Sequence, residues 1–238
     1  MITTVALVAG ATGPLGRAIV ELLSDNGMHV GALSRSGDLP RGAQWGAACD
    51  ITDVAAVDAA ISDLEARLGP VAVLINAAHP PAPGATRIAQ LATDELASQL
   101  AGVAGHAALC ARVIPGMRSA GRGRIVYLAG ALMARPIPGH GAYGAAKAAA
   151  TTLTRFIAVE EGRAGITANI VAPGRVVDPG DPVATDPGWV AAADALTTRM
   201  SLSDFPTSHD VATTVLSLVT NAAVTAQTIW VTGGEPIT

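Results

Sequence analysis

Lys147 is the only lysine in the chain and lies four residues after Tyr143, whereas the other fourteen basic residues are all arginine. On a helix, residues four apart share one face, so the phenol and the ammonium group would point the same way. A compact ammonium group can lower the pKa of a neighbouring phenol and make it a general acid or base near neutral pH. Taken alone, the pair fits equally well an Ala-rich helix with an exposed lysine and a half-buried tyrosine, so the surrounding elements must decide.

A glycine-rich turn follows the first apolar segment, residues 5–9, and precedes a segment with helical spacing of its apolar residues. Small residues let the backbone approach a pyrophosphate, and the helix N-terminus supplies N–H groups and the positive end of its dipole. The alternative is a tight strand–helix turn that binds nothing. We predict a dinucleotide-binding turn with contacts from Gly10, Thr12, Gly13, Leu15 and Gly16.

The residues after the second and third expected strands indicate which dinucleotide is bound. No carboxylate follows the second strand, where it would accept the ribose hydroxyls of NAD; Ser34 and Arg35 stand there instead. Arginine offers a forked donor to a 2′-phosphate, so we predict NADP(H), the alternative being a solvated loop arginine. Asp50 is placed to accept a hydrogen bond from the adenine amino group, and Ile51 beside it is a further predicted cofactor contact. Asp53 is the expected N-cap of the next helix.

The composition favours one globular domain and excludes several classes of partner. Half of the 238 residues are hydrophobic and 14% are charged, so a large core can form, and a net charge of −4 argues against nucleic acid. Cys49 and Cys110 are too few for a disulfide framework, which favours a reduced, cytoplasmic protein. Without a basic N-terminal region or an uninterrupted apolar stretch of 18 residues, we expect no signal peptide and no membrane span. No metal site is predicted.

Strand and helix patterns alternate along the whole chain. Such alternation predicts an α/β, Rossmann-like doubly wound parallel sheet in a single domain, residues 1–238. The expected strands are 5–9, 29–34, 43–48, 71–75, 124–129, 166–171 and 228–231, and the main expected helices are 15–24, 53–68, 94–118, 142–161 and 208–220. The irregular, Pro-rich segment near 174–206 is the natural candidate for a loop over a substrate site.

Read together, these motifs resemble the short-chain dehydrogenases/reductases of classical length, over essentially the whole chain. The residues that carry the resemblance are the glycine-rich turn, Asp50, Asn76–Ala78, the Tyr143/Lys147 pair, Asn169 before Pro173 and Gly174, and the ending Trp230–Gly234. The resemblance implies a sheet of about seven strands and a homodimer or homotetramer formed through the helices at 94–118 and 142–161.

The resemblance also implies roles for individual residues. Tyr143 would be the acid or base on the substrate oxygen, and Lys147 would bind the nicotinamide ribose and lower the pKa of Tyr143. Further contacts with the cofactor would come from Asn76, Ala77, Ala78, Pro173, Gly174 and Val176.

Two positions depart from the family's pattern. The usual serine, thirteen residues before the tyrosine, is replaced by Gly130, and the usual asparagine of the long fourth helix by Gly102. The leading hypothesis is NADPH-dependent reduction of a small, mostly hydrophobic carbonyl compound, or the reverse oxidation of an alcohol. The alternative is a non-redox enzyme of this fold (a cyclase, dehydratase or isomerase) or an inactive scaffold subunit.

Other side chains could serve the substrate in place of the missing groups. His79, His106 and His140 are each placed where an imidazole could donate to a substrate oxygen at neutral pH, although a lone histidine is more often structural. The apolar residues of the lid segment favour a hydrophobic substrate; they are Trp189, Leu196, Met200 and Phe205.

Overall fold

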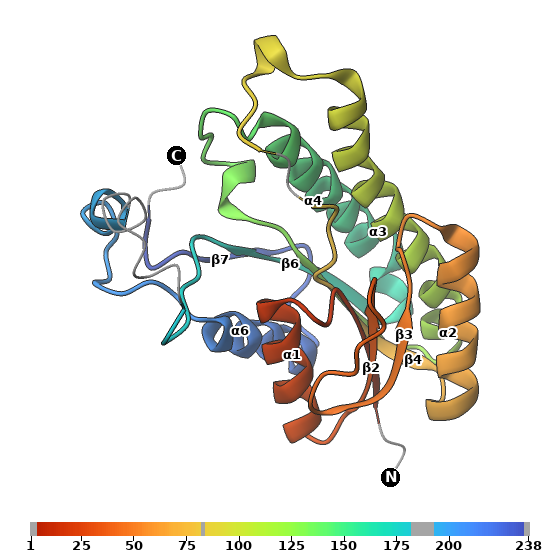
Figure 1. Ribbon diagram of the computed structural model, residues 1–238. Helices are drawn as coiled ribbons and strands as arrows, with labels where there is room; N and C mark the ends of the chain where they lie inside the picture. The colour runs from red at the N-terminus through yellow and green to blue at the C-terminus, as the bar shows by residue number, and fades with distance from the viewer. Residues whose placement is uncertain (1–3, 82–83, 182–192, 236–238) are drawn as a thin grey trace.

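A seven-stranded parallel sheet, in the order β3-β2-β1-β4-β5-β6-β7, forms the centre of the computed structural model, which describes residues 4–81, 84–181 and 193–235 (Figure 1). The strands are β1 (Val5–Ala9), β2 (His29–Ser34), β3 (Ala43–Ala48), β4 (Val71–Asn76), β5 (Gly123–Leu128), β6 (Ile166–Pro173) and β7 (Thr228–Val231). The helices are α1 (Pro14–Asp25), α2 (Val54–Leu68), α3 (Thr93–Ser119), α4 (Gly141–Glu161) and α6 (Ser208–Thr220), with short 3-10 turns at Ile88–Gln90, Ala131–Met133 and Gly162–Ala164. The predicted fold class is confirmed.

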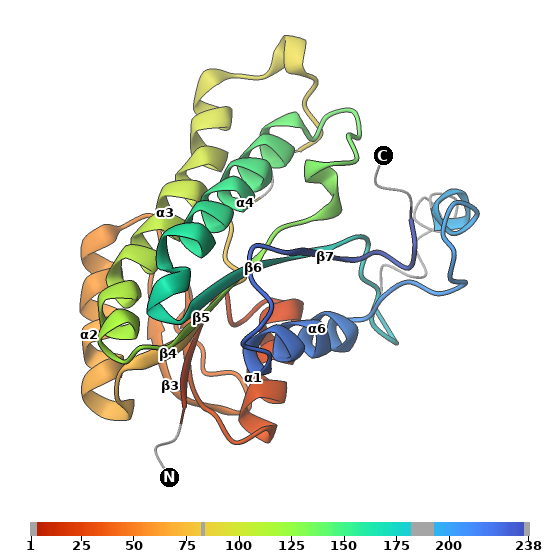
Figure 2. The same cartoon turned by 180° about the vertical axis from the view of Figure 1, so that it is seen from behind.

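The central strands are continuous apolar runs because helices cover both of their faces. Every residue of β1 and β6 is buried. One face packs against α2, α3 and α4, with Leu64 and Leu109 in its core, and the other packs against α1 and α6, with Ile19 and Val215 in its core (Figures 1 and 2). The sheet therefore separates two apolar layers, and its carboxyl edge is left for binding.

The chain changes direction across the sheet at β1, whose neighbours are β2 and β4. In open parallel sheets, ligands bind outside the carboxyl ends of the strands at such a switch point. Here the loops after β1 and β4 are tied together, because the amide of Ala77 donates to the carbonyl of Ala9 at 2.8 Å. The fold thus places the predicted turn and the predicted 76–78 segment at one site.

Helix α3 is long and apolar enough, by length and composition alone, to cross a membrane. It packs here against α2, α4 and the sheet, and Leu109, Val113 and Met117 lie in the core. Buried core helices share that length and composition, so α3 is explained by its place in the fold. The prediction of a protein without membrane partners stays a prediction.

The Pro-rich segment after β6 is held at its two ends. Pro173 is the last residue of β6 and pairs with Val231 of β7. The amide of Val177 donates to the carbonyl of Pro206 at 3.0 Å, and the carboxylate of Asp178 accepts from the amide and hydroxyl of Ser208 at 2.7 and 2.6 Å. The predicted lid includes residues 182–192, with Trp189, which lie outside the described residues.

Candidate active site

The turn after β1 is built for close approach of the backbone. Gly10 has φ of +80°, and a Cβ there would lie 2.6 Å from the backbone of Ala77; a Cβ on Gly16 would collide with the carbonyl oxygen of Gly10. These two glycines are needed by the fold itself. A Cβ at Gly13 would meet only an ordinary contact, 3.8 Å from the carbonyl oxygen of Gly10. Gly13 is the N-cap of α1, which has Pro14 in its first turn and no side-chain cap. Free amides at this end can bind an anion.

The loop after β2 presents Arg35 to solvent while Ser34 is fixed beneath it. Ser34 is buried, and its hydroxyl oxygen accepts from the amide of Gly37 at 3.0 Å. Arg35 has no carboxylate beside it on the strand, but its charge is close enough to contribute to the lowered pKa of Asp50. The guanidinium of Arg35 and the hydroxyl of Ser34 are therefore both placed at this end of the sheet, where both residues line a cavity.

Asp50 and Asp53 make different contacts, and the predicted N-cap role of Asp53 is confirmed. The carboxylate of Asp50 accepts from the amide and the hydroxyl of Thr52 at 2.9 and 2.8 Å, and these two bonds are the main causes of its lowered pKa. The Asp53 carboxylate accepts from the amide of Ala56 at 3.1 Å and caps α2. Asp50 is therefore held as an anion facing the site, whereas Asp53 is structural.

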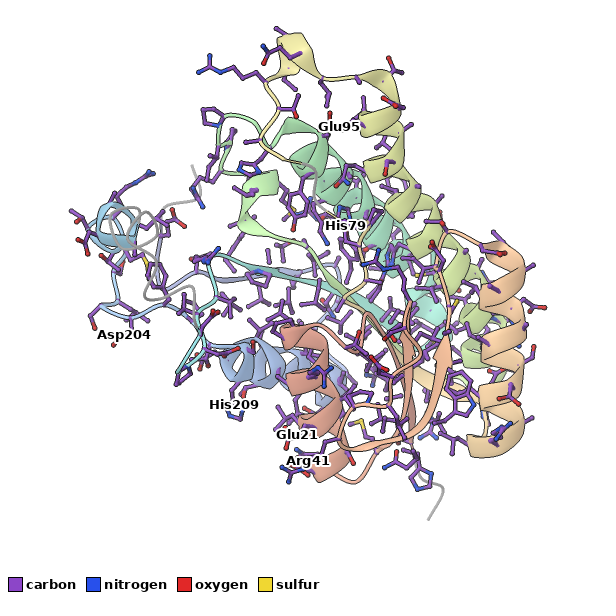
Figure 3. The ribbon with its side chains drawn as sticks, in the orientation of Figure 1. Glu21, Arg41, His79, Glu95, Asp204 and His209 are labelled. Carbon is purple, nitrogen blue, oxygen red and sulfur yellow. The ribbon has the colours of Figure 1, made fainter. Side chains whose placement is uncertain are left out.

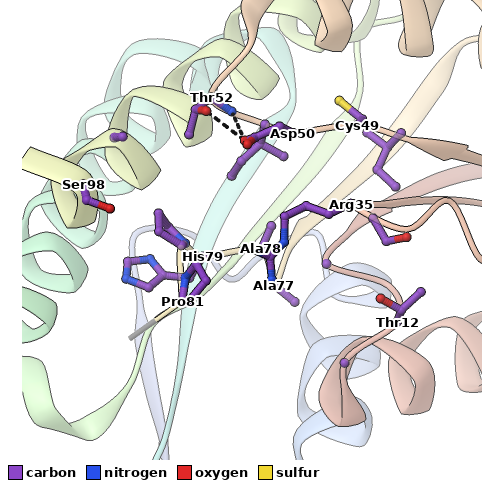
Figure 4. Close-up of a pocket in the computed structure, with 17 residues that line it drawn as sticks. Thr12, Arg35, Cys49, Asp50, Thr52, Ala77, Ala78, His79, Pro81 and Ser98 are labelled. Atoms are coloured by element: carbon purple, nitrogen blue, oxygen red, sulfur yellow. Dashed lines mark hydrogen bonds between the residues drawn. The ribbon is translucent and has the colours of Figure 1, made fainter. Parts of the chain in front are cut away.

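A cavity of about 510 Å³ opens at the carboxyl edge, beside these loops (Figure 4). Nine predicted cofactor residues line it, namely Gly10, Thr12, Gly13, Ser34, Arg35, Asp50, Ile51, Ala77 and Ala78. The remaining predicted ones do not line it: Leu15 and Gly16 lie in the first turns of α1, and Asn76, Tyr143, Lys147, Pro173, Gly174 and Val176 lie toward the other half of the sheet edge. The cavity is large enough for part of a dinucleotide and ends at His79, Pro80 and Pro81.

Asn76 is fully buried and belongs to a chain of hydrogen bonds that joins β4 to α4. Its oxygen accepts from the amide of Ala78 at 3.0 Å, and its nitrogen lies 3.1 Å from Nδ1 of His106. Nε2 of His106 lies 3.0 Å from the hydroxyl of Thr154, which itself donates to the carbonyl of Ala150 at 2.8 Å. All partners are satisfied only if His106 carries its proton on Nε2.

The network excludes His106 as a donor to substrate. Burial and the Lys147 charge lower the pKa of His106 to about 3, so the ring is neutral at pH 7. Both ring nitrogens are occupied inside the protein, so the expectation that His106 could donate to a substrate oxygen is wrong. His106, one turn after Gly102 on α3, instead joins Asn76 to Thr154 beneath the site.

Lys147 lies at the base of the site, almost completely buried. Its ammonium nitrogen donates to the carbonyl of Leu128 at 2.8 Å and lies 5.0 Å from the centre of the Tyr127 ring and 5.6 Å from that of Tyr143. Burial lowers the pKa of Lys147 to about 7 and raises that of Tyr143. The implied lowering of the Tyr143 pKa by Lys147 is not found in this arrangement, because burial disfavours both charged forms.

Gly130 stands at the end of β5, directly against the phenol. A Cβ at Gly130 would lie 3.0 Å from the hydroxyl oxygen of Tyr143, and the backbone there is extended, with φ of −179°. Gly130 therefore faces the hydroxyl of Tyr143 but has no hydroxyl of its own to offer there. Gly102 is buried in α3, where a Cβ would lie 2.6 Å from Cδ of Pro80 and 3.1 Å from Nδ1 of His79.

His79 contacts the ring of Tyr143 edge-on, with ring centres 5.0 Å apart and planes at 83°. Its Nε2 lies 3.0 Å from Oε1 of Gln99, and burial lowers its pKa to about 4. Its one N–H is therefore directed at Gln99, which contradicts the expectation of a donor to substrate. His140 is half-buried at the N-terminus of α4, does not cap it and does not line the cavity.

The segment at the end of β6 closes the site on the far side. The amide of Gly174 donates to the carbonyl of Val231 at 2.9 Å, and Val176 packs against the core of the α1/α6 face. Asn169 is fully buried and structural: its nitrogen donates to Val224 O at 2.8 Å and its oxygen accepts from the amide of Gln227 at 3.1 Å. No cluster of three possible metal ligands occurs within the described ranges.

Comparison with known proteins identifies the family of the chain. The sequence model described as "short chain dehydrogenase" matches residues 4–181, so the chain belongs to the short-chain dehydrogenase family. Its members are oxidoreductases with a nicotinamide cofactor, and the residues that line the cavity fit such a group.

Two curated relatives and one solved structure give the extent of the similarity. The chain is 33% identical over 174 residues, 71% of its length and 66% of the relative's, to the 3-oxoacyl-acyl-carrier-protein reductase MabA of Mycobacterium avium. It is 32% identical over 255 aligned positions, 97% of its length and 96% of the relative's, to a "Putative ketoacyl reductase" of Streptomyces coelicolor. A crystal structure titled as a "putative short-chain dehydrogenase/reductase" from Burkholderia xenovorans superposes with a TM-score of 0.85 at 29% identity, over 98% and 97% of the two chains.

Sequence reasoning missed Gln99 and Thr154, both of which hold histidines of the site. Gln99 lies three residues before Gly102 and Thr154 lies seven after Lys147, so helical spacing places each on the inner face of its helix. Their partners come from segments 20 and 48 residues away, and no local pattern identifies such pairs.

Proposed function

We propose that the protein is an NADP(H)-dependent reductase of a small, mostly hydrophobic carbonyl compound, or the dehydrogenase of the corresponding alcohol. The observation that carries the proposal is the position of the half-buried Tyr143 and the buried Lys147, one turn apart on α4 and beside the end of β5. Tyr143 contacts His79, which lines the cavity. The names of the two curated relatives, both reductases of oxoacyl or ketoacyl compounds, support a carbonyl substrate.

The preference for NADP(H) rests on the loop after β2. Arg35 is exposed and Ser34 is buried, and both line the cavity; neither position carries a carboxylate that would repel a 2′-phosphate. Asp50, after the neighbouring strand β3, accepts from Thr52 and is in a place to accept from an adenine amino group. These residues can therefore distinguish the two cofactors by charge.

The chain's own residues divide the chemistry among them. When bound, the nicotinamide supplies or accepts the hydride at the substrate carbon. Tyr143 holds the proton for the substrate oxygen, and its raised pKa keeps it protonated at pH 7, as reduction requires. Lys147 would hold the ribose hydroxyls with the donors of its ammonium group, and the Asn76–Ala78 loop would contact the cofactor.

Gly130 and Gly102 favour a second candidate from another class. They occupy the positions of the family's serine and asparagine, so neither side chain can polarise a substrate carbonyl or hold a water for proton relay. One missing donor to a developing oxyanion typically costs about 10²–10³ in kcat. A non-redox enzyme or an inactive scaffold subunit would retain the fold and Lys147 for cofactor binding alone.

A panel assay separates the two candidates. Wild-type protein is incubated with NADPH and a series of hydrophobic ketones, aldehydes and 3-oxoacyl thioesters, and loss of the reduced-nicotinamide absorbance is followed. We expect turnover with part of the panel and a loss of about 10²-fold or more in Tyr143→Phe, with unchanged NADPH affinity. Silence across the panel, with NADPH bound tightly, would favour the non-redox or scaffold role.

The remaining expectations stay proposals. The free, buried Cys49 and Cys110 accord with a reduced, cytoplasmic location, and the acidic net charge with a protein that does not bind nucleic acid. Leu196, Met200 and Phe205 are apolar residues of the lid segment within the described ranges, and they accord with a hydrophobic substrate.

A further inference from the structure

We propose that His79 is a positioning residue for Tyr143, locked by Gln99 and accommodated by the absence of a side chain at Gly102. The inference deepens the proposed carbonyl reduction and rests on it for its kinetic test. It assigns a task to His79, which follows the Asn76–Ala78 loop and lies at the end of the cavity (labelled in Figure 3).

The contact itself is specific in geometry. The rings of His79 and Tyr143 meet edge to face, 5.0 Å apart at 83°, which is the favoured arrangement for two aromatic rings. Gly130 faces the phenol without a side chain, so no β5 side chain at this point holds it in place. The imidazole of His79, which follows β4, therefore restrains the Tyr143 ring. On the side of β5, Gly130 offers only backbone to the phenol.

The hydrogen bonds of Gln99 determine the state of the imidazole. The Gln99 nitrogen donates to the carbonyl of Pro81 at 2.8 Å, so its oxygen must be the atom that lies 3.0 Å from Nε2 of His79. A carboxamide oxygen only accepts, so the proton is on Nε2. Burial and the nearby Lys147 charge keep the ring neutral at pH 7. Held in this way, His79 has no proton to offer a substrate, but its ring plane is fixed.

Gly102 supplies the space that this arrangement needs. A Cβ at position 102 would lie 2.6 Å from Cδ of Pro80 and 3.1 Å from Nδ1 of His79. A larger side chain at position 102 would push the 79–81 segment away from α3 and so move the imidazole of His79 away from Tyr143. The replacement at Gly102 and the histidine at 79 thus belong to one local packing solution.

A double-mutant cycle tests whether His79 acts through Tyr143. His79→Ala, Tyr143→Phe and the double variant are compared for kcat and for KM of NADPH, with a substrate that wild type reduces. His79→Phe keeps a ring but loses the bond to Gln99, Gln99→Leu removes that bond alone, and the exposed His209→Ala is the matched control.

We expect His79→Ala to lower kcat about tenfold with little change in KM of NADPH, and to have no further effect in the Tyr143→Phe background. Gln99→Leu and His79→Phe should fall between wild type and His79→Ala, and His209→Ala should match wild type. The melting temperature of each variant is recorded to detect a general loss of stability. A loss of kcat caused by such destabilisation would be equal in the wild-type and Tyr143→Phe backgrounds. Equal loss of kcat in both backgrounds, or no loss in wild type, would overturn the proposal.

A second readout needs no turnover and so separates this proposal from the proposed function. Nitrogen NMR of labelled histidine should show His79 with its proton on Nε2 at pH 7, and carbon NMR of the two tyrosines should give the pKa of Tyr143. We expect His79→Ala to lower that pKa toward the ordinary value, because water then reaches the phenol, and His79→Phe to keep it raised. A proton on Nδ1, or a Tyr143 pKa unmoved in His79→Ala, would contradict the proposal even if no substrate were known.

Discussion

Restoring a hydroxyl beside Tyr143 is the most informative change that the site allows. Gly130 has extended backbone, so serine fits there without strain, and its Cβ would lie 3.0 Å from the hydroxyl oxygen of Tyr143. That distance is a few tenths of an ångström closer than ordinary contact, so the phenol must shift slightly. The hydroxyl of Gly130→Ser would then point toward the oxygen that Tyr143 protonates.

The size of the effect follows from two opposed contributions. A donor to a developing oxyanion contributes about 10²–10³ in kcat, or roughly 2.7–4 kcal/mol. Crowding of Tyr143 by the new Cβ lowers kcat by an amount that Gly130→Ala measures on its own, since alanine adds the same carbon without the hydroxyl. We therefore expect Gly130→Ser to exceed Gly130→Ala in kcat by at least about tenfold, with equal melting temperatures for the two variants.

The assay is steady-state NADPH oxidation with one carbonyl substrate of the wild type, at saturating cofactor. Equal kcat for Gly130→Ser and Gly130→Ala would contradict a direct role of the hydroxyl, because the hydroxyl would then have no access to the reacting oxygen. A serine variant that gains affinity for NADPH without gaining in kcat would also refute it, since the effect would then lie in cofactor binding.

Three further predictions concern cofactor, charge and assembly. Arg35→Asp should reverse the preference from NADPH to NADH in fluorescence titration, and tighter binding of NADH by wild type would contradict the cofactor assignment. Because burial lowers the pKa of Lys147 to about 7 from 10.5, the penalty for burying its charge is complete below pH 7 and fades as pH rises above it. Lys147→Met should therefore raise the melting temperature most below pH 7, and a gain independent of pH would refute this. Phe156 and Val159 are 60% and 77% exposed on α4, so we expect sedimentation to show a homodimer or homotetramer. The double variant Phe156→Glu, Val159→Glu should dissociate it. A wild-type protein that is monomeric at micromolar concentration would contradict this expectation.

The fold could be predicted closely because its signals are local. Strands β1, β2, β3 and β7 and helix α6 have the predicted bounds, since each is an apolar or amphipathic run between turn residues. Other bounds differ by one or two residues, and β6 continues to Pro173 because its last residues pair with β7. Proline can end such a strand because its missing N–H leaves the carbonyl side of the pairing intact.

The candidate site could be predicted only in part. Nine of the proposed cofactor residues line one cavity, because motifs at the carboxyl ends of parallel strands must converge. The tasks of His79 and His106 could not be read from the sequence, because their partners Gln99 and Thr154 lie on other elements. The ion pair between Arg135 and Glu235, 3.0 Å apart and largely buried, likewise joins distant segments and was not foreseen.

Hydride transfer from NADPH to a carbonyl carbon, assisted by Tyr143, can be followed directly with an isotope. The protein is given a carbonyl substrate and NADPH that carries deuterium at the transferring position of the nicotinamide, and the product is analysed by mass spectrometry. We expect an alcohol with one deuterium on the former carbonyl carbon, formed by wild type and lost in Tyr143→Phe. A product without deuterium, or one formed equally well by Tyr143→Phe, would contradict hydride transfer assisted by Tyr143.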